Sequence, residues 1–361
     1  MKYLIIIILG IAGCTSHNVI DVNKNINAVI LSNDKVKQKV IYKANLFPKS
    51  YLQSKNLMMG DNIDLVNFNK DHIRYLTFQN NGDVTVASKN FVNRTSNQTF
   101  IDMDNNGVSE ILATGGGYSD VGLFDNQGRN LWMFKPTKSP VSRLINGNLN
   151  GDKQDEFYAL DKYFIYRLDQ QGNIVWQVDN PAFWNVFSNR ITYIDVFTDK
   201  KTGETSLIAL ADAQLHYYDI NGKVTKIVDL EEDDFWKFKL IDWHGVPHML
   251  IADFYNDFFA LVNMQGKVVH KYPIGDFPAA HLDAILVKFY PEQAPYLVTF
   301  AKTRVVRGQT LISIISPENK LIYQETVYRW SGKATLTKTD NESEVLLFTK
   351  ERKSIVELRM E

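Results

Sequence analysis

The feature that most constrains the fold of this chain is an element that recurs along most of its 361 residues. Each copy is an alternating apolar run, a tight turn and a second alternating run, which is the pattern of a β-hairpin. A glycine or an asparagine stands in each turn, because these residues tolerate the positive φ that a tight hairpin requires. The turn residues are Gly82, Gly128, Gly172, Gly222, Gly266 and Asn319.

A second element, rich in aspartate and asparagine, precedes each hairpin by about twenty residues. Its clearest copies are 102–110 and 148–156, and weaker copies begin near residues 57, 195, 242, 289 and 337. The steps between copies are about 45 to 48 residues, and each step holds about four alternating apolar runs. Four short strands per step are typical of a β-propeller blade. The sequence therefore predicts an all-β fold, a single β-propeller of seven blades.

Six or eight blades are the alternatives, because the first and last repeats are the least regular. A β-sandwich with extra strands is a further alternative, but it gives no reason for a steady period. The last repeat holds only two clear strands, so its blade must be completed from elsewhere in the chain. Apolar runs at 28–31 and 40–44 can supply the missing strands. A ring closed by both termini leaves no open edge strand.

The N-terminus predicts secretion. Lys2 precedes a short apolar run from Leu4 to Ala12, which is the pattern of a signal peptide. The run is too short for a transmembrane helix, which needs about 20 residues. Cys14, the single cysteine of the chain, stands where that run ends. A buried structural cysteine in an ordinary signal peptide is one interpretation of this position.

The segment Ile-Ala-Gly-Cys at 11–14 resembles the lipobox of bacterial lipoproteins. The resemblance implies cleavage before Cys14 and attachment of lipid chains to it, which gives a stable membrane anchor. It also implies three parts: a signal peptide at 1–13, a lipidated tether at 14–25 and a propeller domain at 26–361. Thr15 replaces the aspartate that favours inner-membrane retention in enterobacterial lipoproteins, so we expect the bacterial outer membrane. The sequence does not distinguish a periplasmic from a surface-facing leaflet.

The two clearest acidic loops resemble the calcium loops of FG-GAP/VCBS repeats, which occur in integrin-type propellers. In that family Ca²⁺ is held by oxygens at the first, third, fifth and ninth positions and by the seventh backbone carbonyl. The resemblance implies a first site formed by Asp102, Asp104, Asn106, Glu110 and the Val108 carbonyl. It implies a second site formed by Asn148, Asn150, Asp152, Glu156 and the Gln154 carbonyl.

The chemistry of these loops agrees with the spacing, because Ca²⁺ takes six to eight oxygen ligands. The first loop brings three carboxylates, and the second brings two, with Asp155 as a replacement ligand. We therefore expect the first site to bind more tightly. The alternative is a pair of polar turns that bond to their own backbone and hold no metal. Where such an ion is bound, we expect it to join the strands of one blade, and its protein ligands leave little room for catalysis by a bound water.

Charge and missing motifs limit the function. Forty basic and 41 acidic residues give a net charge of −1, which argues against a general nucleic-acid binder. The chain has no Gly-x-Ser-x-Gly, His-Glu-x-x-His or phosphate-binding glycine loop. His244 and His248 are four residues apart, but Pro247 and the strand pattern argue against the helix that would turn them one way.

These features favour a non-enzymatic binding or scaffold module at the cell envelope, with an envelope protein or a glycan as partner. The alternative is an enzyme that acts on extracellular polysaccharide, a lyase or a glycosidase, with no catalytic residue assigned. Surface adhesion follows only by analogy with the integrin-type loop. The sequence does not determine the oligomeric state. The arginines available for an acidic sugar are Arg143, Arg190, Arg304, Arg307 and Arg329.

Overall fold

A computed structural model describes the repeat region from residue 29 to the C-terminus, with gaps. The described residues are 29–43, 51–54, 63–68, 72–78, 84–90, 95–103, 110–115, 121–125, 129–136, 139–152, 154–181, 193–211, 213–231, 237–252, 258–274, 279–303, 309–328, 334–338, 341–350 and 354–361. The proposed signal peptide, Cys14 and the tether lie outside them. Within these ranges no helix has the length and hydrophobicity that crossing a membrane requires.

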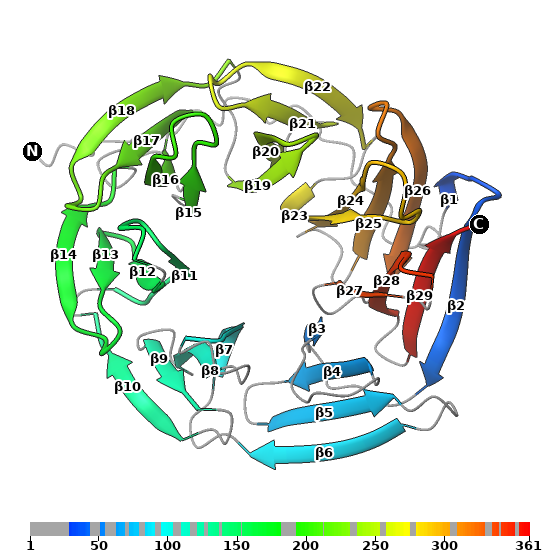
Figure 1. Ribbon diagram of the computed structural model, residues 1–361, viewed down its shortest axis with the longest axis horizontal. Coiled ribbons are helices and arrows are strands. Elements are labelled where there is room, and N and C mark those ends of the chain that lie inside the picture. Colours follow the sequence, from blue (N-terminus) through cyan, green and yellow to red (C-terminus); the bar gives the residue numbers. More distant parts are fainter. Residues whose placement is uncertain are drawn as a thin grey trace, which may run out of the picture.

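The strands of these ranges form seven sheets that follow one another around a ring (Figure 1). Six sheets have four strands and one has five, and consecutive strands of each sheet pair antiparallel. We call each sheet a blade and number the blades in chain order. In blades 2 to 5 the first strand of the blade lies toward the centre and the fourth lies outermost (Figure 1). The predicted seven-bladed propeller is confirmed, and the sandwich interpretation is wrong.

The first four blades each use four consecutive strands. Blade 1 comprises β3 (Tyr51–Ser54), β4 (Ile63–Phe68), β5 (His72–Phe78) and β6 (Val84–Asn90). Blade 2 comprises β7 (Thr95–Ile101), β8 (Glu110–Gly115), β9 (Val121–Phe124) and β10 (Asn130–Phe134). Blade 3 comprises β11 (Arg143–Gly147), β12 (Glu156–Leu160), β13 (Phe164–Leu168) and β14 (Ile174–Asp179). Blade 4 comprises β15 (Tyr193–Thr198), β16 (Thr205–Ala211), β17 (Gln214–Tyr218) and β18 (Val224–Asp229).

Of the last three blades, blades 6 and 7 include strands from the N-terminal region. Blade 5 comprises β19 (Lys237–Trp243), β20 (Val246–Ala252), β21 (Phe258–Asn263) and β22 (Val268–Pro273). Blade 6 comprises β23 (Ala279–Val287), β24 (Tyr296–Thr303), β25 (Gln309–Ile315), β26 (Leu321–Tyr328) and β1 (Val29–Leu31). Blade 7 comprises β27 (Thr335–Lys338), β28 (Glu344–Lys350), β29 (Ser354–Met360) and β2 (Val36–Lys43).

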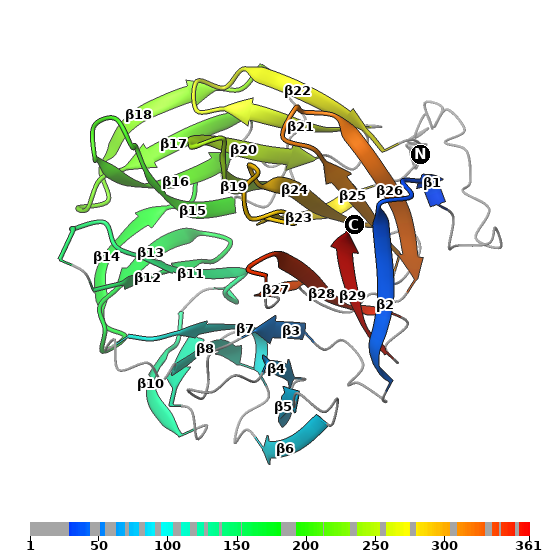
Figure 2. The same ribbon diagram turned by 45° about the vertical axis from the view of Figure 1, so that its right-hand side comes forward.

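The described strands β1 and β2 lie beside the C-terminal strands where the ring closes (Figure 2). Strand β2 pairs with β29 and becomes the outer strand of blade 7, which confirms the role predicted for the run at 40–44. The run at 28–31 has a different place from the one predicted, because β1 pairs with β26 of blade 6. The C-terminal repeat supplies three strands of its own, so blade 7 lacks only one. Strand β1 is therefore left to cover the outer edge of the neighbouring blade.

The hydrophobic core lies between neighbouring blades. Each cluster of buried apolar side chains joins two adjacent sheets: Leu250 and Phe259 of blade 5, for example, pack with Leu297 and Leu311 of blade 6. Further clusters of this kind join blades 2 and 3, 3 and 4, 4 and 5, and 6 and 7. Because a blade buries its faces against its neighbours, the ring is stable only as a closed set.

Candidate functional site

The two acidic loops lie at the same end of neighbouring blades. Loop 102–109 joins β7 to β8, and loop 148–155 joins β11 to β12. Because consecutive strands run in opposite directions, the hairpin between the third and fourth strands lies at this end too. The hairpin residues Gly172, Gly222 and Asn319 have φ of 82°, 77° and 62°, which confirms the predicted turns. Gly82 and Gly128 lie outside the described residues.

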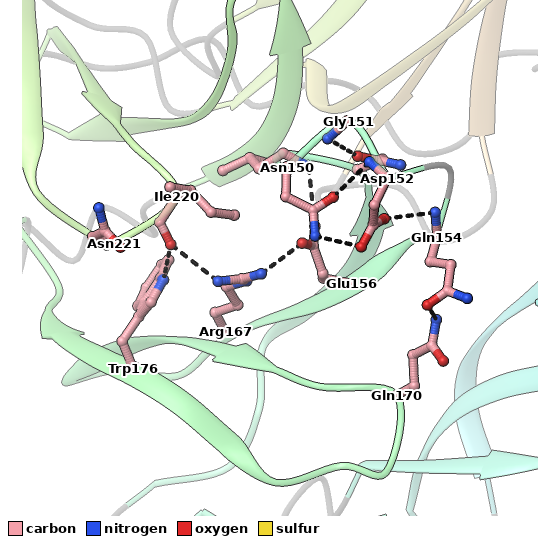
Figure 3. A network of polar contacts seen from close by, with 12 residues as sticks. Asn150, Gly151, Asp152, Gln154, Glu156, Arg167, Gln170, Trp176, Ile220 and Asn221 are labelled. Carbon is pink, nitrogen blue, oxygen red and sulfur yellow. Dashed lines mark hydrogen bonds and ion pairs between the residues drawn. The ribbon is translucent and has the colours of Figure 1, made fainter.

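The second acidic loop closes on itself through side chain to backbone hydrogen bonds (Figure 3). The Gly151 amide donates to Asn148 Oδ1 at 2.6 Å, and the Asp152 amide donates to Asn150 Oδ1 at 2.9 Å. The Gln154 amide donates to Asp152 Oδ1 at 2.8 Å. Asn150 Nδ2 also donates to Asp152 Oδ2 at 2.7 Å. These bonds are those of consecutive Asx turns, which short polar side chains form locally.

Glu156 ends this loop and is buried. Its Oε2 accepts the Leu149 amide at 3.0 Å and the Tyr158 hydroxyl at 3.1 Å. Its Oε1 accepts Arg167 Nη2 at 2.6 Å, in an ion pair whose side chains are only 13% and 8% exposed. Burial, and then the Glu156 charge, raises the pKa of Tyr158, so the phenol keeps its proton and donates. Both carboxylate oxygens of Glu156 are therefore occupied by protein donors.

Arg167 extends this network into the next blade (Figure 3). Its Nη1 donates to the Ile220 carbonyl at 3.1 Å, in the hairpin of blade 4. Trp176 Nε1 donates to the same carbonyl at 2.8 Å. The Trp176 indole also lies against Gly222, where a Cβ atom would come within 2.9 Å of Cδ2. The guanidinium of Arg167 thus bridges the acidic loop of blade 3 to the hairpin of blade 4.

The first acidic loop repeats one part of this arrangement. Glu110 Oε2 accepts the Met103 amide at 3.0 Å, as Glu156 accepts the Leu149 amide. The ninth-position glutamate therefore closes the loop backbone in both blades, a role that the sequence pattern did not indicate. Asp102 directly follows β7. The predicted ligands Asp104, Asn106 and Val108 lie outside the described residues.

The second loop, as arranged, does not fit a calcium ion. Calcium requires six to eight oxygen ligands, and the guanidinium of Arg167 occupies Glu156 Oε1. The side-chain NH₂ group of Asn150 donates to Asp152, and an NH₂ group in this place repels a cation. No group of three or more His, Cys, Asp or Glu that could hold a metal occurs among the described residues. Calcium at the first loop stays a prediction, and at the second loop it would have to displace Arg167.

Other residues singled out from the sequence have structural contacts or fall in the gaps. Arg143 Nε donates to the Ile194 carbonyl at 2.7 Å, and its guanidinium lies 3.4 Å from the centre of the Tyr193 ring. Arg143 therefore joins blade 3 to blade 4. His248 lies in β20, which confirms that no helix presents it with His244. The described residues do not include Arg190, Arg304, Arg307 and Arg329.

Comparisons with known proteins identify the fold. No protein-family model matches the sequence, and no curated protein matches it significantly. The structure is similar to BBS1N in its complex with ARL6DN: for a crystal soaked with mercury the TM-score is 0.58, at 11% identity over 92% of this chain and 97% of that chain. For the crystal soaked with lead the TM-score is 0.60, at 10% identity over 93% and 97%.

A chain of the Mitotic Checkpoint Complex is also similar, with a TM-score of 0.55 at 9% identity over 92% of this chain and 93% of that chain. Each similarity covers nearly the whole of both chains, so the ring as a whole is matched. At identities this low the similarity shows the fold alone.

Proposed function

We propose that this chain is a non-enzymatic binding module, anchored by lipid at Cys14 in the bacterial outer membrane, that presents its propeller to an envelope protein. The observation that carries the proposal is a set of exposed apolar side chains on the outer strands of blades 2, 3 and 4. We call this set the outer apolar band and define it by Leu131, Met133, Ile174, Val175, Val224 and Ile227.

The outer apolar band runs over three consecutive blades. Leu131 of β10, Ile174 of β14 and Ile227 of β18 are 53%, 50% and 52% exposed. The three strands follow one another around the left side of the ring (Figure 1). Exposed apolar side chains on neighbouring strands are candidate positions for a protein or membrane interaction site. The outer edges of these strands also carry backbone groups that an added strand can pair with.

Blade 6 supplies an internal precedent for such pairing. Its fourth strand, β26, is covered by β1, so this chain already adds a strand to the outside of one blade. An extended segment of a partner protein could pair in the same way with β10, β14 or β18. The similar structures also come from crystals titled as complexes, BBS1N with ARL6DN and the Mitotic Checkpoint Complex. Both observations support a protein partner over a glycan.

The anchor and the calcium loops enter the proposal from the sequence. The lipobox-like segment ends in the only cysteine of the chain, and a multiply acylated cysteine gives stable anchoring. The first acidic loop, with three carboxylates, is proposed to hold Ca²⁺ and to stiffen blade 2.

The test is chemical crosslinking and affinity purification from native membranes, with Ca²⁺ and with a chelator. We expect a reproducible envelope protein to copurify with the wild type and to be lost from the double variant Ile174→Glu/Ile227→Glu. The control is Gln177→Glu, which places the same charge at an exposed polar position of β14. A monomer without a partner under every condition would overturn the proposal and direct attention to glycan binding and turnover.

A further inference from the structure

The junction between blades 2 and 3 matches the junction between blades 3 and 4 in register. Leu123 of β9 pairs with Trp132 of β10, as Arg167 of β13 pairs with Trp176 of β14. Each of Leu123 and Arg167 also stands five positions before its hairpin glycine. Leu123 therefore occupies the place of Arg167.

The two positions share a glutamate and an indole among their described neighbours. Glu110 stands in the place of Glu156 and bonds its loop backbone in the same way. The Trp132 indole lies against Gly172, where a Cβ atom would come within 2.7 Å of Cε3, as the Trp176 indole lies against Gly222. Both junctions thus have a glutamate on one side and an indole stacked on a hairpin glycine on the other.

The donors that complete the later junction are missing from the earlier one. Leucines, Leu112 and Leu123, stand at the two positions that hold a phenol and a guanidinium in blade 3. Within the described residues, no donor reaches Glu110 Oε1 or the Gln170 carbonyl, which corresponds to the carbonyl that Arg167 binds. Trp132 Nε1 is buried and has no hydrogen-bond partner among the described residues.

A pocket of about 380 Å³ lies in the place of the missing side chain. Its walls include Met103, Glu110, Leu123, Trp132, Gln170 and Gln171. Glu110 is the single charged side chain of the described lining, and Met103 and Leu123 are apolar. The pocket therefore combines one carboxylate, an aromatic face, amide oxygens and apolar walls.

We propose that this pocket binds a guanidinium group in the place that Arg167 takes at the next junction. A guanidinium presents a planar fork of donors that suits the Glu110 carboxylate and the Gln170 carbonyl together. The Trp132 ring offers a face on which a guanidinium stacks. The apolar walls accept the methylene stem of an arginine. A calcium ion in the first acidic loop would use the same Glu110 carboxylate, so Ca²⁺ and a guanidinium compete for it.

The guanidinium can belong to an arginine of the protein partner or to a free small molecule. The first source rests on the binding function proposed above, whereas the affinity of the pocket for a guanidinium does not. The experiment therefore measures both separately.

The test uses the full-length protein in detergent with its tryptophan indoles labelled with ¹⁵N. The chain has six tryptophans, and the Trp132 resonance is assigned with Trp132→Phe. The probes are N-acetyl-arginine amide and N-acetyl-lysine amide. We expect the arginine probe to shift the Trp132 resonance saturably and to bind several-fold more tightly than the lysine probe.

Two variants remove the pocket in different ways. Glu110→Gln is expected to weaken binding of the arginine probe by about tenfold or more, since a charge-assisted bond is lost. Leu123→Arg is expected to abolish binding, because the chain then supplies its own guanidinium. The control Glu204→Gln removes an exposed carboxylate from the equivalent loop of blade 4 and is expected to leave binding unchanged. A Trp132 resonance that does not respond, or equal affinity in Glu110→Gln, would overturn the proposal.

A second experiment tests whether the guanidinium comes from the partner. It repeats the crosslinking and affinity purification from native membranes with Glu110→Gln. Loss of the crosslinked partner, together with loss of probe binding, supports an arginine of the partner as the source. Retention of the partner with loss of probe binding supports a free guanidinium compound. If the protein binds the arginine probe but captures no partner, the proposed guanidinium pocket is supported and only the binding-module proposal is refuted.

Discussion

The two junctions of blade 3, one with blade 2 and one with blade 4, share a glutamate, a hairpin glycine and an indole. They differ in the residue that stands between these groups. Toward blade 4, Arg167 joins a loop glutamate to the Ile220 carbonyl. Toward blade 2, Leu123 leaves the corresponding groups apart, and a pocket lies between them. These two junctions therefore share the positions of the glutamate, the glycine and the indole, while one strand position decides whether the junction is bridged or open.

Blade 4 gives a third version of that position. Tyr217 stands five residues before Gly222, and its hydroxyl donates to the Met264 carbonyl of the next hairpin at 3.3 Å. A phenol here replaces the guanidinium of Arg167 as the donor to the hairpin. A bridge across the junction thus requires a donor of sufficient length, and leucine cannot provide one.

The largest effect is expected from Arg167→Leu, which converts the bridged junction into the open form. It leaves the buried Glu156 carboxylate without its partner, and we expect a loss of about 3 to 5 kcal/mol in the free energy of unfolding. Denaturant unfolding measures this loss. The control Arg129→Leu breaks an ion pair to Asp125 whose arginine is 81% exposed, so a loss below about 1 kcal/mol is expected. Equal losses in the two variants would contradict a bridging role.

The hairpin glycines test whether the indole contact is equally close at both junctions. Gly172→Ala and Gly222→Ala each place a methyl group against an indole at a positive φ. We expect each to cost about 2 kcal/mol, from backbone strain and the clash together. Gly151→Ala is the matched control: its φ is +76°, but no atom lies within 4 Å of the added Cβ. A cost of about 1 kcal/mol is expected there, and thermal denaturation of the three variants gives the ranking.

Calcium binding is expected to distinguish the two acidic loops. If the first loop binds the ion, Ca²⁺ at ten times its Kd should stabilise the protein by about 1.4 kcal/mol. Asp104→Asn is expected to remove this gain. Asp152→Asn is expected to keep it, because the second loop is closed by its own hydrogen bonds and by Arg167. Melting temperatures with Ca²⁺ and with a chelator measure the effect, and a gain that survives Asp104→Asn would refute the first site.

The smallest effect is expected from Tyr217→Phe, about 1 kcal/mol for one hydrogen bond. Burial, followed by the Asp199 charge, raises the pKa of Tyr217 to about 12. A raised pKa means that its contribution to stability is complete below pH 10 and is lost as the pH rises toward 12. Urea unfolding from pH 9 to 12 should therefore show a fall in stability that is shallower in Tyr217→Phe. An unchanged slope would mean that Tyr217 does not ionise on unfolding.

The parts of the structure that local chemistry determines were predictable from the sequence. Gly172, Gly222 and Asn319 mark hairpins because their turns require positive φ, and Asn148 to Asp152 form a loop because short polar side chains bond nearby amides. The place of β1 was not predictable. It depends on pairing with β26, almost 300 residues away, and three apolar residues pair equally well with any open edge.

The bridge of Arg167 was also missed, for a related reason. Its acceptor, the Ile220 carbonyl, belongs to the next repeat. Because every residue has a backbone carbonyl, the residue type does not show which one accepts a hydrogen bond. An alignment of the repeats on their hairpin turn residues would have placed Leu123, Arg167 and Tyr217 at one position, together with Thr77, Leu261 and Ile314. A change of residue type at one position of an otherwise regular repeat indicates a position whose contacts differ between blades.

The closure of the ring has a consequence for how the protein is made. Val36, near the start of the propeller, pairs with Met360, the last residue but one. Strand β2 therefore has no pairing partner while all the blades between are synthesised, and the ring can close only when the final strand is present. A chain that stops before residue 354 would leave a strand edge exposed at each side of the gap, and such edges aggregate. The first strands of the propeller therefore need protection from aggregation until the last strands of the chain have been synthesised.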